Sequence, residues 1–421
     1  MGLDGGHPSA LFIGHCVPQP SNQNIGPWAL RQLQALARAG VEVRTLRLTP
    51  WFPPLVRKLR RVRGVADAPP EHRWENIVVE YPRWPYYAVG PLDKLARENP
   101  WAHLRAAYRV ASRRLRRAVR EFKPDVIFAH HTAVGGYVAY RLSKEFGIPY
   151  VVTDHDFDEI GDCAKFPRRR ELFDVVQRSA AQMIDVSNRM RDIRRSVFPD
   201  IQSVVVHNGA DPVPEELRSK PRPPELQGKL VVNCVSAWYG RKGIPKLVEA
   251  FDLAAGQFPD AVLRLVGDGP DRPAVEAAIA AATHKAQIQV VGRVPHSQAL
   301  QEMCWADIYA LIGKDEPFAT TYTEAMMAGL PLIWPSDCGH NDVLRDGVHG
   351  LQVPPWDVGA TAAALGQMLA DGGLRQRTGE LNREFGLGSL TWDANARRLV
   401  EIFSAAAGAA PARPSGYNES E

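Results

Sequence analysis

Two glutamates that lie eight residues apart, Glu316 and Glu324, are the residues whose spacing most clearly suggests chemistry. They flank the point where a predicted strand leads into a predicted helix, within the segment DEPFATTYTEAMMAG (315–329). Backbone amides converge at such a helix N-terminus and favour a phosphate group. Glu324, about one turn into the helix, could accept two hydrogen bonds from the vicinal hydroxyls of a ribose. The alternative is that both glutamates are solvated charges at a helix end, the usual position of surface carboxylates.

The elements that must position these glutamates form an alternating strand–helix pattern in the second half of the chain. Hydrophobic periodicity predicts strands at 229–236, 261–267, 288–292, 307–312 and 331–335, and helices at 243–256, 271–282, 296–304, 321–328 and 392–405. Such alternation implies a parallel sheet with helices on both faces.

The first half of the chain shows the same alternation. We expect strands at 10–16, 41–48, 125–130, 149–154, 182–187 and 203–209, and helices at 27–39, 101–121, 134–145 and 169–182. Residues 50–105 are rich in Pro, Trp, Tyr and Arg without a clean period, so we expect an elaboration on the first domain. Residues 212–228 carry five prolines and predict a linker.

Composition and charge narrow the class of protein. The 421 residues are 45% hydrophobic and 23% charged, which allows two or three domains with cores of their own. Positive charge is concentrated in the first 211 residues, and the remainder is net negative. A basic face could meet nucleic acid, anionic lipid or a phosphorylated acceptor, and the absence of any recognisable nucleic-acid module favours the latter two.

Cysteine usage and hydropathy bear on the compartment. The five cysteines are scattered and form no CxxC pair, which predicts neither a disulfide framework nor a zinc knuckle and favours a reducing cytoplasm. The sequence contains no apolar run of about 18 residues, so we expect no transmembrane helix. The N-terminus lacks the basic region and apolar core of a signal peptide.

The segment 315–329 resembles the E-x7-E signature of the retaining glycosyltransferases of GT-B fold, in particular the GT4-like family, also called glycosyltransferase group 1. Further resemblances follow one another in the order of that family: VVHNGADP (205–212), GRKG (240–243), LVGDGPDRPAVE (265–276), VVGRVPHSQALQEMCWADIYAL (290–311) and SDCGHNDVLRDGVHGLQVPPWD (336–357). The resemblance covers roughly residues 8–48 and 122–385 and is most specific over 229–357. It implies two doubly wound Rossmann-like domains that face a cleft.

The resemblance also implies roles for single residues. Glu324 matches the residue that binds the ribose hydroxyls, and Glu316 matches the one that holds donor-sugar hydroxyls near the reacting carbon. Lys242, with Arg241, matches the site that neutralises the diphosphate. A departing nucleoside diphosphate gains negative charge, which two cations and a helix N-terminus can stabilise without a metal.

Other positions match the family's donor contacts. The backbone of Ala319, Thr320 and Thr321 matches the stretch whose amides meet phosphate or sugar. Arg293 and Val294 match the turn that contacts the base. His155 matches a histidine that faces the donor sugar, and Gly26 matches the flexible glycine loop near the donor phosphates.

The sequence departs from the family's pattern at three positions. Gly26 is followed by Pro27 where the family shows two adjacent glycines. Ala319 stands where a glycine follows the phenylalanine of the signature, so the backbone there is less permissive. Ala237 replaces an arginine ahead of Lys242, and Arg241 is the residue that could substitute for it.

Two other features carry weaker metal signals. Asp154, Asp156 and Asp158 form DHDFD after a strand, and such carboxylates can hold Mn²⁺ or Mg²⁺ on a diphosphate in another glycosyltransferase fold. The favoured alternative is a set of loop acids around His155, because the matched architecture uses no metal. His130 and His131 end a strand where ligands gather in open sheets, but they lack metal-ligand spacing, and packed or solvated histidines are favoured.

Two basic segments of the first domain suggest a membrane surface. Arg57, Lys58, Arg60 and Arg61 lie in LVRKLRRVR (55–63), with 113–120 equally basic and several aromatic residues nearby. This composition is typical of an interfacial patch on anionic lipid. A solvated basic helix face is the open alternative.

We therefore predict a metal-independent, retaining glycosyltransferase that needs no cofactor and uses a UDP- or GDP-sugar as donor. The predicted domains are an acceptor-binding domain (1–211), a linker (212–228), a nucleotide-sugar domain (229–385), a helix returning to the first domain (386–405) and a disordered tail (406–421). The acceptor would be a glycan or lipid-linked sugar of polysaccharide or glycolipid synthesis, in the cytoplasm or at the inner membrane face. A sugar-nucleotide epimerase of the same fold and a non-catalytic sugar-nucleotide-binding protein stay open as alternatives.

Overall fold

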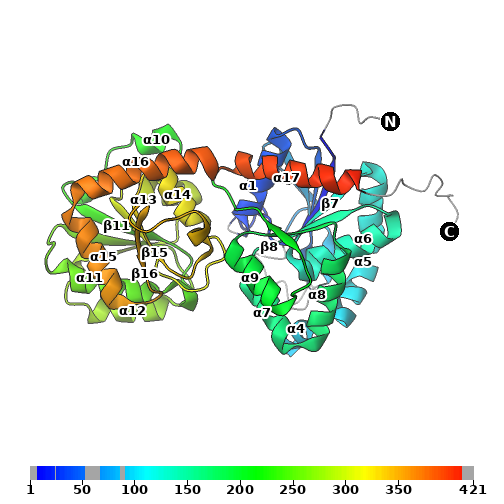
Figure 1. Ribbon diagram of the computed structural model, residues 1–421, viewed down its shortest axis with the longest axis horizontal. Coiled ribbons are helices and arrows are strands. Elements are labelled where there is room, and N and C mark those ends of the chain that lie inside the picture. Colours follow the sequence, from blue (N-terminus) through cyan, green and yellow to red (C-terminus); the bar gives the residue numbers. More distant parts are fainter. Residues whose placement is uncertain (1–6, 24, 53–66, 86–90, 410–421) are drawn as a thin grey trace. The chain divides into compact units, whose positions relative to one another are not determined.

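A computed structural model describes residues 7–23, 25–52, 67–85 and 91–409. The chain divides into two compact units (Figure 1). Unit 1 comprises Met1–His207 and Trp392–Glu421, and unit 2 comprises Asn208–Thr391. The sequence predicted a first domain of 1–211, a linker of 212–228 and a second domain of 229–385.

Unit 1 is built on one long sheet. Its strands are β1 (Ala10–Gly14), β2 (Val43–Arg47), β3 (Thr49–Trp51), β4 (Glu71–Trp74), β5 (Ile77–Glu80), β6 (Arg83–Pro85), β7 (Val126–His130), β8 (Tyr150–Asp154), β9 (Gln182–Asp185) and β10 (Ser203–Val205). The sheet order is β10-β9-β8-β7-β1-β2-β5-β4, and β3 pairs with β6 apart from it. The sheet is parallel except at its edge, where β4 runs antiparallel to β5. The segment 50–105 thus contributes regular strands where the sequence showed no clean period.

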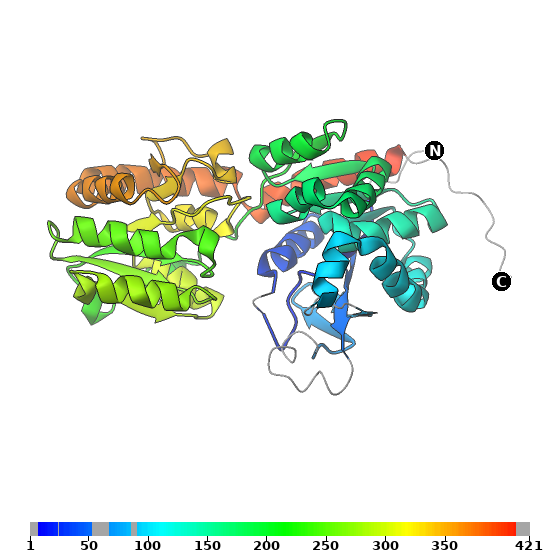
Figure 2. The same cartoon turned by 90° about the horizontal axis from the view of Figure 1, so that it is seen from below.

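Helices cover both faces of this sheet (Figure 2). They are α1 (Pro27–Arg38), α4 (Pro91–Glu98), α5 (Pro100–Phe122), the π-helix η1 (His131–Gly136), α6 (Tyr137–Phe146), α7 (Phe157–Lys165), α8 (Pro167–Ser179), α9 (Asn188–Val197) and α17 (Trp392–Gly408). The helix expected at 169–182 is α8, which begins earlier at Pro167 and follows the separate helix α7. Pro167 explains the break, because proline begins a helix well but does not continue one.

The C-terminal helix α17 belongs to the core of unit 1. Its apolar face packs with α1 and the central strands, and the rings of Phe128 and Phe403 lie 5.2 Å apart. Polar contacts also join α17 to α1: Gln32 Nε2 donates to Asn395 Oδ1 at 2.9 Å, and Arg38 pairs with Asp393 at 2.7 Å. Figure 1 shows α17 beside α1. The helix runs three residues beyond the predicted end at 405, because its apolar face is still buried there.

Unit 2 holds the second parallel sheet, with the order β13-β12-β11-β14-β15-β16. Its strands are β11 (Leu230–Val235), β12 (Ala261–Val266), β13 (Ile288–Gly292), β14 (Ile308–Ala310), β15 (Leu332–Pro335) and β16 (Gly350–Val353). Its helices are α10 (Glu215–Arg218), α11 (Ile244–Ala255), α12 (Arg272–Ala281), α13 (His296–Cys304), α14 (Thr320–Ala328), α15 (Val358–Ala370) and α16 (Gly372–Ser389), with short 3₁₀ turns η2 (Pro224–Leu226), η3 (Gly240–Lys242), η4 (Lys285–Gln287) and η5 (Gly339–Asp342). Numbered within the unit, the strand order is 3-2-1-4-5-6, the doubly wound order of nucleotide-binding folds.

The proline-rich segment 212–228 packs against unit 2. Gln301 Nε2 donates to the Leu217 carbonyl at 2.8 Å, and Arg222 pairs with Asp307 at 2.8 Å. Leu226 is fully buried. The prolines and low hydrophobicity of this segment predicted a linker between domains. In the structure a few contacts hold the segment on unit 2.

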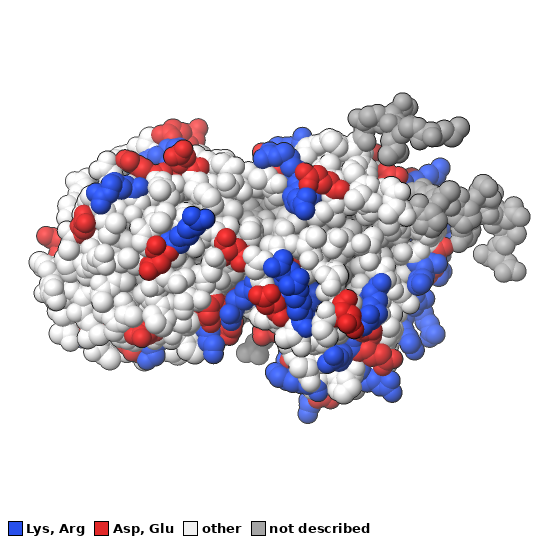
Figure 3. Space-filling model, in the orientation of Figure 1, with Lys and Arg blue, Asp and Glu red and all other residues white. Residues whose placement is uncertain are grey.

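Among the described residues, no helix combines the length and apolarity that a bilayer crossing requires. On the face shown in Figure 3, Lys and Arg side chains of unit 1 are interleaved with Asp and Glu side chains. In α5, for example, Arg116 pairs with Glu145 and Arg117 with Glu121. The basic stretch 113–120 is therefore partly neutralised by neighbouring carboxylates. Arg57, Lys58, Arg60 and Arg61 lie outside the described residues.

Candidate functional site

The topology of unit 2 favours a ligand site at the carboxyl ends of β11 and β14. These two strands are neighbours in the sheet, yet the chain leaves β11 toward β12 on one side and β14 toward β15 on the other. Where the strand order reverses in this way, the loops after the strands diverge and leave room for a ligand at the carboxyl ends. The loop after β11 carries Arg241 and Lys242, and the loop after β14 carries Glu316.

The structure brings these three side chains together. Lys242 Nζ lies 2.6 Å from Glu316 Oε2, and Arg241 Nη1 lies 3.9 Å from Glu316 Oε1. Glu316 is only 1% exposed, and its Oε1 makes no hydrogen bond within the described part of the chain. Arg241 also donates to the Asp315 carbonyl at 3.1 Å, which ties the two loops together. A buried carboxylate with one free acceptor oxygen, flanked by two cations, is suited to hold a hydroxyl group beside an anionic group.

Glycines let the backbone turn tightly around this pair. Gly243 ends the turn η3 with φ 66°, and a Cβ there would lie 2.6 Å from the Trp356 ring. Gly267, in the turn after β12, has φ 138°, and its Cβ would lie 1.8 Å from the Ser236 carbonyl oxygen. Both positions therefore require glycine, and they fix the course of the loop that carries Lys242.

Helix α14 begins next to Glu316. Ala319 is its N-cap residue, Thr320 and Thr321 form its first turn, and within the described residues no side chain caps its amides. Ala319 has φ −71° and ψ 115°, ordinary extended values that any residue adopts, so alanine fits where the family pattern has glycine. The Phe318 ring stacks on His340 at 3.7 Å and anchors the turn. Uncapped amides at the start of a helix attract anions.

The remaining predicted donor contacts lie elsewhere in unit 2. Glu324 Oε1 lies 2.8 Å from His296 Nε2, and its side chain stays partly accessible. Arg293 is exposed and donates to the Asp268 carbonyl at 3.5 Å, with Val294 half-buried beside it. Sequence reasoning did not foresee His296 as a partner of Glu324, because the two residues are 28 positions apart.

Gly26 and His155, the other two predicted site residues, belong to unit 1. Gly26 caps α1 with φ 59°, and a Cβ there would lie 2.3 Å from the Cys16 carbonyl oxygen. The Trp28 ring lies 4.0 Å from His155 and stacks on His130 at 5.3 Å. The glycine thus lets α1 approach the loop after β1, which brings Trp28 onto the histidines at the ends of β7 and β8.

Burial sets the protonation of this histidine cluster. Burial lowers the pKa of both His130 and His155 well below the usual value, and neighbouring histidines add to the effect. His130 Nε2 contacts Gln32 Oε1 at 2.9 Å, which suits a neutral ring. Burial also lowers the pKa of His131, but the Cys16 thiol and the Glu159 carboxylate outweigh it, so the net shift is upward. Two histidines with lowered pKa values, His130 and His155, therefore lie beside His131, whose pKa is raised.

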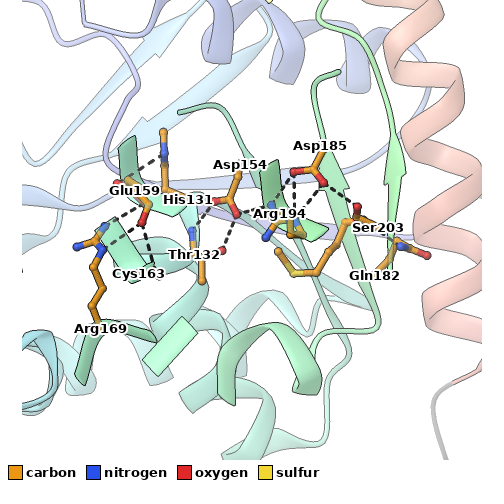
Figure 4. A network of polar contacts seen from close by, with 11 residues as sticks. His131, Thr132, Asp154, Glu159, Cys163, Arg169, Gln182, Asp185, Arg194 and Ser203 are labelled. Carbon is orange, nitrogen blue, oxygen red and sulfur yellow. Dashed lines mark hydrogen bonds and ion pairs between the residues drawn. The ribbon is translucent and has the colours of Figure 1, made fainter. Parts of the chain in front are cut away.

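A buried ionic network lies behind these histidines (Figure 4). Arg194 is fully buried and pairs with Asp185 at 2.6 Å and with Asp154 at 2.8 Å. Asp154 in turn accepts from the backbone amide and the hydroxyl of Thr132, each at 2.7 Å. Burial would lower the pKa of Arg194, but the two carboxylates outweigh it and raise it. The network fixes the start of η1 to β8, β9 and α9.

This network changes the interpretation of the acidic motif DHDFD. Asp154 is a buried strand residue whose oxygens are taken by Thr132 and Arg194. Asp156 accepts from the Asp158 amide at 3.0 Å and caps α7. The expectation that Asp154 is a loop acid is therefore wrong, because Asp154 ends β8 and is buried. The sequence did not reveal its partner Arg194, which lies 40 residues away. The helix α9 that carries Arg194 was not predicted.

Comparison with known proteins identifies the family. A family model described as glycosyl transferases group 1 matches residues 215–385, and one described as glycosyltransferase family 4 matches residues 27–213. The chain belongs to the GT4-like glycosyltransferases of GT-B fold. One match covers most of unit 1 and the other most of unit 2 of this glycosyltransferase.

Relatives of known name agree with this assignment. TuaC of Bacillus subtilis, named for teichuronic acid biosynthesis, is 27% identical over 84% of this glycosyltransferase and 87% of its own length. A glycogen synthase of Mycobacterium tuberculosis is 25% identical over 68% of this chain and 70% of its own. Sucrose-phosphate synthase from Thermosynechococcus elongatus superposes with a TM-score of 0.75 at 21% identity, covering 94% and 98% of the two chains. HepE of Anabaena in complex with UDP-glucose superposes with a TM-score of 0.66 at 18% identity over 94% and 100%. At these identities the two structures show the shared fold alone.

Proposed function

We propose that this glycosyltransferase transfers a sugar from a nucleoside diphosphate sugar to a glycan or lipid-linked acceptor, with retention of anomeric configuration and without a metal ion. The observation that carries the proposal is the contact of Lys242 with the buried Glu316 beside the start of α14. Cationic groups beside an uncapped helix start are suited to a diphosphate. The neighbouring carboxylate oxygen is suited to a sugar hydroxyl.

The donor would bind across the carboxyl ends of the strands of unit 2. Lys242 and Arg241 neutralise the diphosphate, Glu316 accepts from the sugar hydroxyls, and Glu324 accepts from the ribose. Arg293 and Val294 contact the base. One solved neighbour holds UDP-glucose, and one relative from Mycolicibacterium smegmatis is named as GDP-mannose-dependent, which supports a UDP- or GDP-sugar as the donor. The roles that the family resemblance implies for His155 and Gly26 stay predictions.

Cleavage of the donor leaves negative charge on the diphosphate as the sugar carbon becomes cation-like. Lys242, Arg241 and the amides of α14 stabilise this charge in place of a metal. In a retaining transfer the acceptor hydroxyl attacks the face from which the diphosphate leaves, and an oxygen of the leaving group takes its proton. TuaC and the glycogen synthases are named for polymer synthesis, which supports polysaccharide or glycolipid biosynthesis as the setting.

A thermal-shift screen of nucleotide sugars tests the donor assignment. A ligand at 100 times its Kd stabilises the folded protein by about 2.7 kcal/mol. The best donor is then incubated with a panel of glycan and lipid-linked acceptors, and the product linkage is determined by NMR. Nucleoside diphosphate release without acceptor would point to an epimerase, and an inverted linkage would refute retention. Loss of activity in EDTA that is restored only by adding Mg²⁺ or Mn²⁺ would refute the metal-free mechanism.

We also propose that the basic segment around Arg57, Lys58, Arg60 and Arg61 binds an anionic membrane surface at the cytoplasmic face. Each basic side chain near such a surface contributes about 1 kcal/mol. The full chain should float with vesicles that contain anionic lipid at low salt, and neutralising these four residues should abolish flotation. Equal flotation of the neutralised variant would refute the patch.

A further inference from the structure

Nitrogen and sulfur side chains converge at the strand-order reversal of unit 1, and the proposed donor mechanism assigns none of them a role. β1 and β7 are adjacent parallel strands, and the chain leaves them toward opposite sides of the sheet. His15 and Cys16 follow β1, and His131 follows β7. One ligand atom from each of these three residues lies within 4.8 Å of the others.

The imidazoles of this cluster have few other partners. His15 Nδ1 and both ring nitrogens of His131 are buried, and they make no hydrogen bond of ordinary geometry within the described residues. His131 is only 7% exposed, and the two rings lie 4.8 Å apart. Leaving buried polar atoms without a hydrogen-bond partner destabilises a fold, so such atoms call for a ligand.

The backbone holds His131 in place at some cost. His131 has φ 64°, a conformation that few residues other than glycine adopt. It opens the π-helix η1, whose second residue, Thr132, is tied to the buried pair of Asp154 and Arg194 (Figure 4). Strained positions persist where the surroundings over-determine them, and they cluster at binding sites.

A second group of possible ligands shares His131 with Asp154 and Glu159. Asp154 is excluded because Thr132 and Arg194 already occupy its oxygens. Glu159 differs, since its Oε2 makes no hydrogen bond within the described segments and its Oε1 lies 3.9 Å from His131 Nδ1. Glu159 can therefore orient the His131 ring or complete the set of ligands.

We propose that His15, Cys16 and His131 form a zinc site in unit 1. Two imidazoles and a thiolate match the preference of Zn²⁺, whereas Mg²⁺ and Ca²⁺ prefer oxygen. On binding, the Cys16 thiol releases its proton to solvent and coordinates as a thiolate. The three ligand atoms already lie within 4.8 Å of one another.

The site has an entry path. His15, Cys16 and Glu159 line a cavity of about 720 Å³ within unit 1, together with Arg47 and Trp84. Three protein ligands would leave a fourth position for water or for Glu159. Sites of this kind hold an exchangeable ligand, in contrast to closed structural sites with four protein ligands.

The inference is tested by metal binding to the full chain, without turnover. The protein is freed of affinity tags, reduced, stripped of metal and titrated with Zn²⁺ against a competing dye. One Zn²⁺ should bind per chain, and Co²⁺ should give a sulfur-to-metal charge-transfer band with tetrahedral visible bands. Cys16→Ser should remove the charge-transfer band, and His15→Gln should weaken Zn²⁺ binding at least about 100-fold, because even outer-shell partners alter affinity 10–100-fold.

Matched controls separate this site from adventitious binding. Cys304→Ser and His72→Gln change residues of similar exposure in other elements and should bind Zn²⁺ as the unaltered protein does. His131→Asn should also weaken Zn²⁺ binding, because it removes an imidazole ligand. Asparagine tolerates the left-handed backbone at this position, so the variant should fold; if it does not, His15→Gln and Cys16→Ser decide. Equal Zn²⁺ affinity in Cys16→Ser and the unaltered chain, or loss of binding in either control, would overturn the proposal. Because no activity is measured, either result leaves the proposed transferase function unaffected.

Discussion

Lys242→Met removes one cation from the proposed diphosphate site while it keeps most of the side-chain volume. In the structure the Lys242 side chain is 12% exposed, and its ammonium lies 2.6 Å from Glu316 Oε2. Arg241 is the other cation near this carboxylate, at 3.9 Å from Oε1, and its side chain is 40% exposed. The substitution therefore leaves the buried Glu316 with one distant, solvated partner.

The substitution should lower both kcat and the free energy of unfolding. Removing one donor from a site that stabilises developing charge costs about 3–4 kcal/mol in the barrier. At about 1.4 kcal/mol per factor of ten, this lowers kcat by roughly 100- to 1000-fold. Breaking a fully buried ion pair also destabilises a fold by about 3–5 kcal/mol. Because Lys242 retains some solvent contact, we expect a stability loss below that range and a folded variant.

The assay is the initial rate of nucleoside diphosphate release at saturating donor and acceptor, with thermal unfolding as a check of folding. Lys246→Met is the matched control, since Lys246 lies on the exposed face of α11 and pairs with Glu249 at 2.8 Å. Surface substitutions of this kind change free energies by about 0.5 kcal/mol or less, so the control should keep its rate within about twofold. A folded Lys242→Met enzyme with kcat within about threefold of the unaltered enzyme would refute the role of Lys242.

Three further outcomes are expected. Glu324→Gln should raise the donor KM by about 10- to 100-fold with a smaller change in kcat, since hydrogen bonds to a charged group contribute about 1.5–3 kcal/mol. Arg194→Leu leaves Asp154 and Asp185 as unpaired buried carboxylates and should destabilise unit 1 by about 3–5 kcal/mol in denaturant unfolding. Burial lowers the pKa of His130, so below pH 6.5 the unfolded chain takes up a proton that the folded chain does not, and the free energy of unfolding decreases as the pH is lowered. His130→Leu should reduce the slope of this decrease by up to about 1.4 kcal/mol per pH unit.

Each of these outcomes has a control. His296→Gln removes the partner of Glu324 but keeps the carboxylate, so its donor KM should change less; an equal change would contradict a direct role for Glu324. Arg178→Leu breaks an exposed pair with Asp174 and should alter stability by about 0.5 kcal/mol or less. Hydrogen exchange in unit 1 across pH 5–7.5 measures the slope, and an unchanged slope in His130→Leu would contradict the pKa argument.

The sequence by itself determined the repeated α/β pattern and the order of the glycosyltransferase motifs. Buried parallel strands are continuous apolar runs, and helices between them show a regular apolar face, so both are local signals. The E-x7-E segment lies at a strand-to-helix turn, as its local pattern predicted. Local patterns do not predict structure that depends on tertiary contacts. The proline-rich segment 212–228 packs on unit 2 through such contacts. Helix α9 was missed because its arginine-rich sequence has the composition of an exposed segment.

Only the tertiary structure decided which charged groups meet. The contact of Lys242 with Glu316 joins residues 74 positions apart, and that of Arg194 with Asp154 joins residues 40 apart. No spacing rule predicts such pairs, because they depend on which strands and helices become neighbours in the folded unit. For the same reason His15, Cys16 and His131 look unrelated along the chain, although β1 and β7 bring them to one edge.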